Sequence, residues 1–553
     1  MTLELDLIIT AREIVTLDPA RPSATRVGVI NGRIVGFDEQ LDGVTALRHE
    51  DFGEATVTPG LIDAHCHTAW WGLGLTAIDL SELRGLDQLY AAIEQEVARL
   101  DAAGETDAWV HGTGFNQAHH SGEFPSIARL DELTGDHPLY LRHTSGHAAI
   151  TNSVTLDMVG ALDPQFENPT GGVVVRDANG APTGLIEEAA QGLIQDLLLP
   201  YATDRLVEAL DAATIRYAKQ GITSFTEAGI AGGWIGHSPA EVAAYQAAAE
   251  QGRLHARAQL MPTLDALRTI TANAADFHGE GSGNGIDLGI RFGFGTDMVQ
   301  LGHVKAFMDG SLLGATAAVT EDFCGAHNHG NRGYLLDDPE TYRERVLATY
   351  RTGWPLALHA IGDAAIDLAL DLIEEAQNRY GSKGVPCRIE HFGISRPEQL
   401  ERAGKLGVAV TPQAGFISAF GQQMADQVGP ERADWLYRGR SVIDAGIILA
   451  GSSDLPVADN NLRRGMQAAV DRVTEAGTQI GPNEAITNEE ALRCYTQWAA
   501  TATGQIADKG TLERGKLADF TVFSQSPLTA ENISELDIVA TVVGGELRFD
   551  SRK

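Results

Sequence analysis

The sequence predicts an α/β fold: a (β/α)8 barrel of the TIM type, a small β-sandwich-like domain formed by both termini, and a large insertion after the first barrel strand. Three observations lead to this prediction. Short apolar runs alternate with helix-periodic segments through the middle of the chain, a pattern typical of βα units with a parallel sheet. Both ends of the chain are strand-like. A gap of roughly 160 residues, far longer than a usual βα connection, separates the first two predicted strands.

The small β-domain combines residues 1–56 with residues 508–553. Near the start, the segments LDLIIT, EIVTL, RVGVI and NGRIVGF are strand-like. Near the end, residues 518–523 and 538–549 have the same character. We therefore expect the two ends of the chain to pair in one sheet domain.

The barrel is expected over residues 57–507. Eight predicted strands with helices between them correspond to the (β/α)8 architecture. The strands are expected at residues 57–63, 222–227, 256–261, 303–308, 356–359, 388–391, 408–411 and 447–450. The helices are expected at residues 204–220, 239–251, 339–352, 364–379, 397–406 and 462–476.

An inserted subdomain is expected at about residues 70–203. Its last part, GGVVVRDANGAPTGLI, predicts a hairpin around Asn179-Gly180, which indicates a structured insertion. Because the insertion follows the first strand, we expect it to cover the mouth of the barrel at the carboxyl ends of the strands.

The composition excludes several classes of partner. The chain has 553 residues, with 75 acidic against 41 basic side chains, and its formal net charge is −34. Nucleic acids and anionic membranes are bound by basic patches, so neither is expected here. No apolar stretch approaches the ~18 residues of a membrane span, and the four cysteines lack the spacing of a disulfide framework or zinc knuckle. We expect a cytoplasmic protein that binds a small molecule, with a homodimer left open.

Four histidines and an aspartate follow or close predicted strands. In Asp63-Ala64-His65-Cys66-His67 the two imidazoles lie on one side of the strand, because strand side chains alternate. His359, His391 and Asp454 lie at the ends of three other strands, and the strand ends of a barrel meet at one mouth. As core residues, each would need a separate buried partner. The pattern therefore favours a metal centre.

Lys305 is one of only seven lysines, yet it lies within an apolar predicted strand. A buried ammonium is costly unless it is paired or neutralised. A neutral lysine amine can react with carbon dioxide to form a carbamate, whose two oxygens could bridge two cations. The alternative is an ion pair with Asp297 or Asp309.

Several motifs resemble the amidohydrolase superfamily of metal-dependent hydrolases. They are PGLIDAHCH at residues 59–67, followed in order by Lys305, His359, His391 and Asp454. More narrowly, VKAFMDGSL, LHAIGDAAID, RIEHFGI and GSSDLPV resemble the amidohydrolase-3 or YtcJ-like subgroup, which includes N-substituted formamide deformylases. Residues 509–519 are similar to the family's return into its small β-domain, so the resemblance runs from end to end.

The resemblance implies two divalent metal ions and a lysine carbamate. One ion would be held by His65, His67 and Asp454 and the other by His359 and His391, with carboxylated Lys305 as the bridge. A hydroxide bridging the ions would attack the substrate, with Asp454 as general base and then general acid. We expect zinc, although these ligands also suit iron, manganese and nickel.

Five further side chains are candidates for contact with the substrate. His147, from the insertion, is a candidate catalytic hydrogen-bond donor, and the alternative is a structural role. Glu188 is a candidate contact or a carboxylate that favours a helix start. Three aromatic side chains would suit an apolar substrate group or pack as part of a lid: Trp70, Phe115 and Phe416.

The predicted function is binuclear, metal-dependent hydrolysis of an amide-type C–N bond in a small molecule. Two alternatives stay open. A mononuclear deaminase of the same superfamily would use a glutamate shortly after the fifth-strand histidine, whereas His359 is followed by Ala-Ile-Gly-Asp. A non-catalytic metal-binding barrel would have lost ligands, and none is missing.

Overall fold

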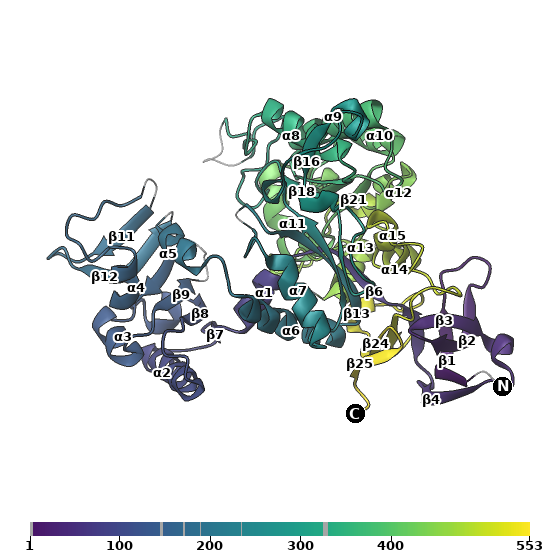
Figure 1. The fold of residues 1–553 in the computed structure, drawn as a ribbon, viewed down its shortest axis with the longest axis horizontal. Helices are drawn as coiled ribbons and strands as arrows, with labels where there is room; N and C mark the ends of the chain where they lie inside the picture. The colour runs from purple at the N-terminus through teal and green to yellow at the C-terminus, as the bar shows by residue number, and fades with distance from the viewer. Residues whose placement is uncertain are drawn as a thin grey trace. The chain divides into compact units, whose positions relative to one another are not determined.

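The computed structural model describes residues 4–143, 148–169, 172–188, 190–233, 235–324, 330–459 and 461–553. Its contacts divide the chain into two compact units, which can be followed by colour in Figure 1. One unit is Trp70–Ala212, and the other joins Met1–Ala69 to Ala213–Lys553. The smaller unit is therefore continuous in sequence and interrupts the larger one.

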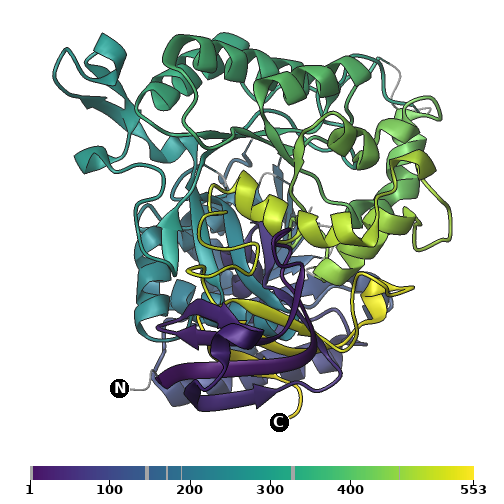
Figure 2. The same cartoon turned by 90° about the vertical axis from the view of Figure 1, so that its right-hand side faces the viewer.

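Eight strands from both ends of the chain form one sheet of the larger unit. They are β1 (Glu4–Val15), β2 (Ser23–Ile30), β3 (Arg33–Phe37), β4 (Thr45–Asp51), β5 (Thr56–Pro59), β23 (Phe520–Phe523), β24 (Ile538–Val543) and β25 (Glu546–Asp550). Their order is β25-β24-β23-β5-β1-β2-β3, and β4 pairs with β1. Figure 2 shows the purple N-terminal strands beside the yellow C-terminal ones. The two halves meet where β5 runs antiparallel to β23, with Val57 opposite Val522.

Nine further strands of this unit form two parallel sheets. The first is β17-β14-β13-β6 and the second is β18-β19-β20-β21-β22. Their bounds are β6 (Leu61–Cys66), β13 (Ile222–Ile230), β14 (Arg257–Pro262), β17 (Val299–Leu301), β18 (Val304–Phe307), β19 (Leu356–Ala360), β20 (Arg388–His391), β21 (Ala409–Thr411) and β22 (Ile448–Leu449). A parallel bridge between Thr263 and Lys305 links the sheets at one side, and Ala64 N–H donates to Gly451 O at the other. The fold is thus mixed α/β with parallel sheets.

The predicted first strand, residues 57–63, is two strands in the structure. β5 ends at Pro59 and belongs to the terminal sheet, whereas β6 begins at Leu61 and belongs to a parallel sheet. Gly60 lies at the change of sheet. Only glycine fits at this position, because a Cβ would lie 2.1 Å from Thr223 Oγ1. The dipeptide Pro59-Gly60, which is typical of turns, marks the division in the sequence, but the apolar residues on both sides favour one continuous strand.

Helices alternate with the parallel strands. Those of the larger unit include α6 (Thr203–Lys219, which begins in the smaller unit), α7 (Glu241–Glu250), α8 (Pro339–Arg351), α9 (Asp363–Tyr380), α10 (Pro397–Leu406), α11 (Gly415–Val428), α12 (Arg440–Asp444), α13 (Leu462–Asp471), α14 (Asn488–Cys494) and α15 (Gln497–Ala502). The helix predicted at 462–476 ends at Asp471, because Arg472 takes a left-handed φ of 54°. Among the described residues, no helix combines the length and apolarity needed to cross a bilayer.

The smaller unit is built on a six-stranded mixed sheet in the order β11-β12-β10-β9-β8-β7. The strands are β7 (Ile78–Asp79), β8 (Val110–Phe115), β9 (Leu139–His143), β10 (Ala148–Thr151), β11 (Gly172–Arg176) and β12 (Pro182–Glu188). The helices are α1 (Thr68–Leu75, which begins in the larger unit), α2 (Leu86–Ala103), α3 (Ile127–Thr134), α4 (Ser153–Met158) and α5 (Gln191–Leu198). The antiparallel pairing of β11 with β12 forms the hairpin expected around Asn179-Gly180.

A buried ion pair joins the parallel sheet to the C-terminal part of the chain. Arg257 on β14 donates from Nε to Asp519 Oδ2 at 2.7 Å and from Nη2 to Oδ1 at 2.9 Å. Asp519 also accepts the Gly544 N–H at 2.7 Å. Both side chains are almost completely buried, so each charge depends on the other for its solvation.

We expect Asp519→Asn to destabilise the protein by about 3–5 kcal/mol, because it leaves the Arg257 guanidinium buried without a counter-charge. The measurement is the midpoint of denaturant or thermal unfolding. Glu54→Gln is the matched control, since it makes the same change in an exposed pair with Arg12 and should cost at most about 1 kcal/mol. Equal midpoints for the two variants would show that the buried pair is dispensable.

Candidate metal centre

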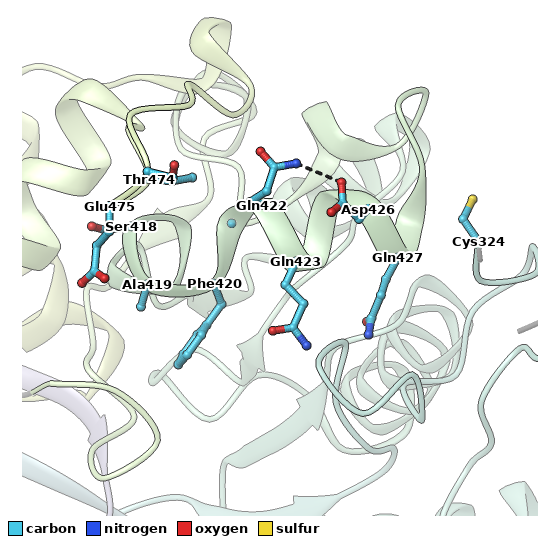
Figure 3. A pocket seen from close by; sticks show the side chains of 12 residues that line it. Cys324, Ser418, Ala419, Phe420, Gln422, Gln423, Asp426, Gln427, Thr474 and Glu475 are labelled. Atoms are coloured by element: carbon cyan, nitrogen blue, oxygen red, sulfur yellow. Dashed lines mark hydrogen bonds between the residues drawn. The ribbon is translucent and has the colours of Figure 1, made fainter. Parts of the chain in front are cut away.

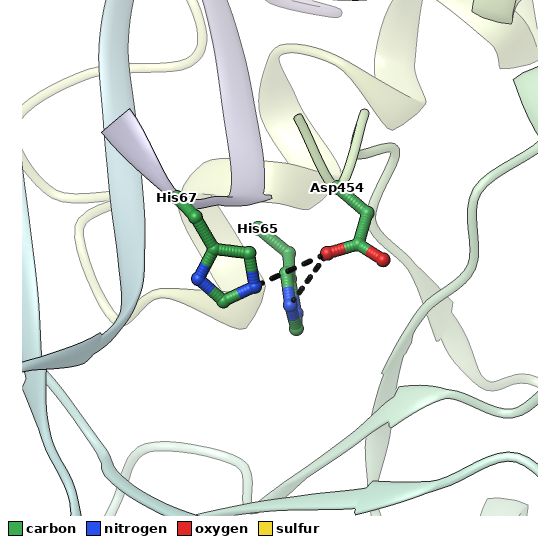
Figure 4. Close-up of side chains that lie close together, drawn as sticks. All are labelled: His65, His67 and Asp454. Atoms are coloured by element: carbon green, nitrogen blue, oxygen red, sulfur yellow. Dashed lines mark ion pairs between the residues drawn. The ribbon is translucent and has the colours of Figure 1, made fainter. Parts of the chain in front are cut away.

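Three candidate ligands lie together at the end of β6 and in the loop after β22 (Figure 4). Their donor atoms all lie within 4.8 Å of one another. Asp454 Oδ1 is 3.4 Å from His65 Nε2 and 3.3 Å from His67 Nε2. All three side chains are buried. Two imidazole nitrogens and a carboxylate oxygen in this arrangement suit a divalent cation such as zinc.

Local contacts fix the loop that carries Asp454. Asp454 N–H donates to His65 O at 2.9 Å, so the loop is tied directly to β6. Asp63 accepts hydrogen bonds from Ser453 N–H at 3.0 Å and from Ser453 Oγ–H at 2.5 Å. The candidate ligands His391 and Asp454 take left-handed φ values of 69° and 56°. Side chains adopt this conformation at a cost, and such residues concentrate at functional sites.

His359, His391 and Lys305 lie beside the first three ligands. The ring centroids of His359 and His391 are 4.4 Å apart, and those of His65 and His391 are 4.8 Å apart. Lys305 Nζ is 3.5 Å from His65 Nε2. The structure therefore brings together all six side chains that the sequence analysis named as metal ligands.

Each of three histidines uses one ring nitrogen for a contact with the surrounding protein. His65 Nδ1 bonds to Glu390, His391 Nδ1 lies 2.8 Å from Gln413 Oε1, and His359 Nε2 lies 3.1 Å from Gly310 O. Metal-binding histidines usually donate their second N–H to such a partner, which fixes the tautomer. Among the residues that the structure describes, the buried His359 Nδ1 has no hydrogen-bond partner. The residues therefore fit a metal centre, because a buried nitrogen of this kind needs a ligand.

Burial holds His67, His359 and His391 in the neutral form that binds metals. Burial lowers the pKa of His67 to about 4 and that of His391 to about 3, in spite of the nearby Asp454 carboxylate. Burial also holds the pKa of His359 well below its usual range. No proton therefore competes for these nitrogens at neutral pH.

Lys305 does not form the ion pairs that were its alternative role. Asp309 accepts backbone N–H groups of Ala318, Ile361 and Gly362 at 2.8–3.0 Å. Asp297 pairs with Arg33 at the surface. Lys305 is fully buried, and burial lowers its pKa to about 8, which makes the neutral amine accessible near neutral pH.

Arg388 and Glu390 form a buried ion pair that the sequence analysis did not identify. Arg388 donates from Nε and Nη2 to the two Glu390 oxygens, both at 2.8 Å, and also to Ala64 O at 2.7 Å. Burial alone would raise the pKa of Glu390, but Arg388 and His65 hold it well below its usual range. The sequence did contain a signal for this pair, because Arg388 and Glu390 place opposite charges two residues apart in a predicted strand.

The structure does not test the remaining candidates as contacts of a substrate. His147 lies outside the described residues. Glu188 ends β12, Trp70 lies on α1 and Phe115 ends β8, all in the smaller unit, and their substrate contacts stay predictions. Phe115 is fully buried in the core of that unit, which favours its packing role. Phe416 is buried on the first turn of α11 against Tyr437, at a ring distance of 5.7 Å.

A cavity of about 640 Å³ opens further along α11 (Figure 3). It is lined by polar side chains such as Gln422 and Asp426, with Cys324 and Phe420. None of the six candidate ligands lines it, so this cavity is separate from the metal centre.

Comparisons with known proteins confirm the resemblance seen in the motifs. The sequence profile of the amidohydrolase family matches residues 50–549. N-substituted formamide deformylase from Arthrobacter pascens is 30% identical over 564 residues, which cover 100% of this chain and 99% of that protein. YtcJ from Bacillus subtilis (strain 168) is 28% identical over 535 residues, or 95% and 94% of the two chains. A solved metal-dependent hydrolase from Pyrococcus horikoshii shares the fold, with a TM-score of 0.75 at 21% identity over 96% of this chain and 99% of that one.

We expect Glu390→Gln to weaken metal binding about 10- to 100-fold, because His65 loses the carboxylate that orients its ring. The measurement is metal affinity by competition with a chelator, together with the unfolding midpoint of the metal-free protein. Glu398→Gln, which removes an exposed carboxylate paired with Arg396, is the matched control. If the metal affinities of the two variants agree, Glu390 does not position the ligand.

Proposed function

Because this chain belongs to the amidohydrolase family and is a metal-dependent hydrolase, we propose that it cleaves the C–N bond of a small linear amide, such as an N-substituted formamide or an N-acyl amine. The observation that carries this proposal is the buried cluster of His65, His67 and Asp454 beside His359, His391 and Lys305. The substrate class is supported by the name of the relative from Arthrobacter pascens, which matches over the whole chain.

We assign one cation to His65, His67 and Asp454, and a second to His359 and His391. Lys305, as a carbamate, would supply an oxygen to each. When bound, such cations lower the pKa of water and polarise the carbonyl group of a substrate. Histidine and carboxylate ligands suit zinc, and also iron, manganese or nickel.

Asp454 is the proposed proton carrier. Burial alone would raise its pKa, but His65 and His67 keep it ionised, so it can accept a proton from the attacking water. It then donates that proton to the leaving nitrogen. The loop that carries Asp454 is tied to β6 through His65 O and Asp63, which keeps the carboxylate in place during both transfers.

The same proposal includes the architecture around the centre. The Thr263–Lys305 bridge and the Ala64–Gly451 hydrogen bond support closure of the two parallel sheets into a (β/α)8 barrel. Contacts of His147, Glu188, Trp70, Phe115 and Phe416 with the substrate remain part of this proposal.

A mononuclear deaminase is the second candidate. In its favour, the described residues contain only one group of three or more side chains whose donor atoms lie close enough together to hold a metal ion, namely His65, His67 and Asp454. Against it, Lys305 lies beside His65, and the segment after His359 contains no glutamate before Asp363. Two metal equivalents per chain support the binuclear hydrolase, one supports the deaminase, and none supports a non-catalytic barrel.

We expect Asp454→Asn to lower the rate of amide hydrolysis by about 10²- to 10⁴-fold, because the amide cannot accept the proton of water. The measurement is turnover of formanilides, N-acyl amino acids, lactams and carbamates by metal-loaded protein. Asp459→Asn, an exposed change five residues further along, is the control. Native turnover by Asp454→Asn would rule out this proton carrier, and full activity of chelated protein would rule out the metal centre.

We expect Lys305→Met to bind about one metal ion per chain where the native protein binds about two, because the bridging group is lost. Carbon-13 NMR after growth or exchange in labelled bicarbonate tests the carbamate directly. Lys405→Met, an exposed change, should keep both the metal content and the carbamate signal. Two bound ions in native protein without that signal would contradict the carbamate.

A further inference from the structure

A second concave site lies among turns that precede the parallel strands. It encloses about 460 Å³ and is formed by the turn η4 (Phe277–Gly279), the segment before β17, the end of α8 and the loop before β20. Lys383 precedes β20, whereas the metal-ligand candidate His391 ends it. The pocket is therefore at the amino end of β20 and the metal centre is at its carboxyl end.

The pocket is lined by cations without any carboxylate. Its side chains include Phe277, His278, Arg291, Phe292, Arg351 and Lys383. Within the described parts of the chain, the Arg291 guanidinium and the Lys383 ammonium have no carboxylate at ion-pair distance. Arg351 has one, Glu280, at 3.9 Å. In a chain with 75 acidic side chains, a group of cations with so few counter-charges is unusual.

Neutral groups hold these cations in place. Lys383 Nζ lies 4.6 Å from the centroid of the Tyr350 ring, a cation–π contact. Arg351 Nε donates to Ser282 O at 2.7 Å. The Arg291 side chain lies over Gly353, where a Cβ would come within 3.0 Å of Nη1. These contacts position the positive groups without adding a carboxylate to the weak Arg351–Glu280 pair.

Like charges held together raise the free energy of the pocket unless an anion joins them. Burial lowers the pKa of Lys383, and the nearby Arg291 lowers it further. A phosphate offers several acceptor oxygens to guanidinium and ammonium donors at once, which is the geometry that arginine matches well. Phe277 and Phe292 on the same wall would pack against an organic group attached to it.

We propose that this pocket binds phosphate, either inorganic or carried by a small organic molecule. The proposal rests on Arg291, Arg351 and Lys383 and is independent of the reaction at the metal centre. The volume of the pocket lies within the range of small-ligand sites.

Calorimetric titration of the metal-loaded protein tests this site, with inorganic phosphate and adenosine monophosphate as probes. We expect Arg291→Gln/Lys383→Gln to weaken binding about tenfold or more, since two charge-assisted contacts are lost. Arg12→Gln/Lys405→Gln is the control, because it removes two exposed cations that have carboxylate partners. Any phosphate held at the metal centre is retained by both double variants and is subtracted.

A second measurement follows the rate at which an acetylating reagent modifies Lys383, read by mass spectrometry with Lys405 as internal reference. Phosphate should slow modification of Lys383 several-fold and leave Lys405 unchanged. Similar affinities for the two probes support an inorganic phosphate site, and tighter binding of adenosine monophosphate supports a phosphate ester. Native affinity in the Arg291/Lys383 variant, or no protection of Lys383, overturns the proposal.

Discussion

The candidate metal centre is positioned by one buried ion pair, that between Arg388 and Glu390. Glu390 bonds to His65, and Arg388 bonds to the carbonyl of Ala64, so both partners act on the strand that carries the first two ligands. Both side chains are fully buried. Removing one member of such a pair leaves an uncompensated charge, which proteins tolerate poorly. The position of β6 is therefore fixed in part by β20 of the other parallel sheet, and the Asp454 N–H is tied to β6 through its hydrogen bond to His65 O.

Burial acts in opposite directions on the groups of this centre. It keeps His67, His359 and His391 neutral, which prepares them as ligands. It also disfavours the charged forms of Lys305 and Asp454, but hydrogen bonds from His65 and His67 keep the Asp454 carboxylate ionised, whereas the pKa of Lys305 stays lowered. The same buried environment therefore holds an amine with a lowered pKa beside an ionised carboxylate, because the neighbours of the two groups act differently on their charges.

The sequence was sufficient to name candidate ligands that the structure brings together, because each lies in or at the end of a predicted strand and strand ends converge in α/β folds. It was not sufficient to identify what holds them. Glu390 and His65 are 325 positions apart, and no local pattern reports such a contact. The helix α11 was missed although Phe416 lies on it, and the helix predicted at 462–476 was too long because Arg472 departs from helical geometry. Of the insertion, only the hairpin had a distinct signal, since its mixed sheet is assembled from distant strands.

The pairing of β5 with β23 has a consequence for how the protein is made. A single residue, Gly60, separates β5 from β6, which carries His65 and is followed by His67. β5 pairs with β1 on one side and with residues 520–523 on the other. During synthesis, the chain therefore presents its first candidate metal ligands long before β23, the strand that completes the terminal sheet beside them. Asp454 also precedes residues 520–523, so all six candidate ligands are synthesised before this sheet can be completed.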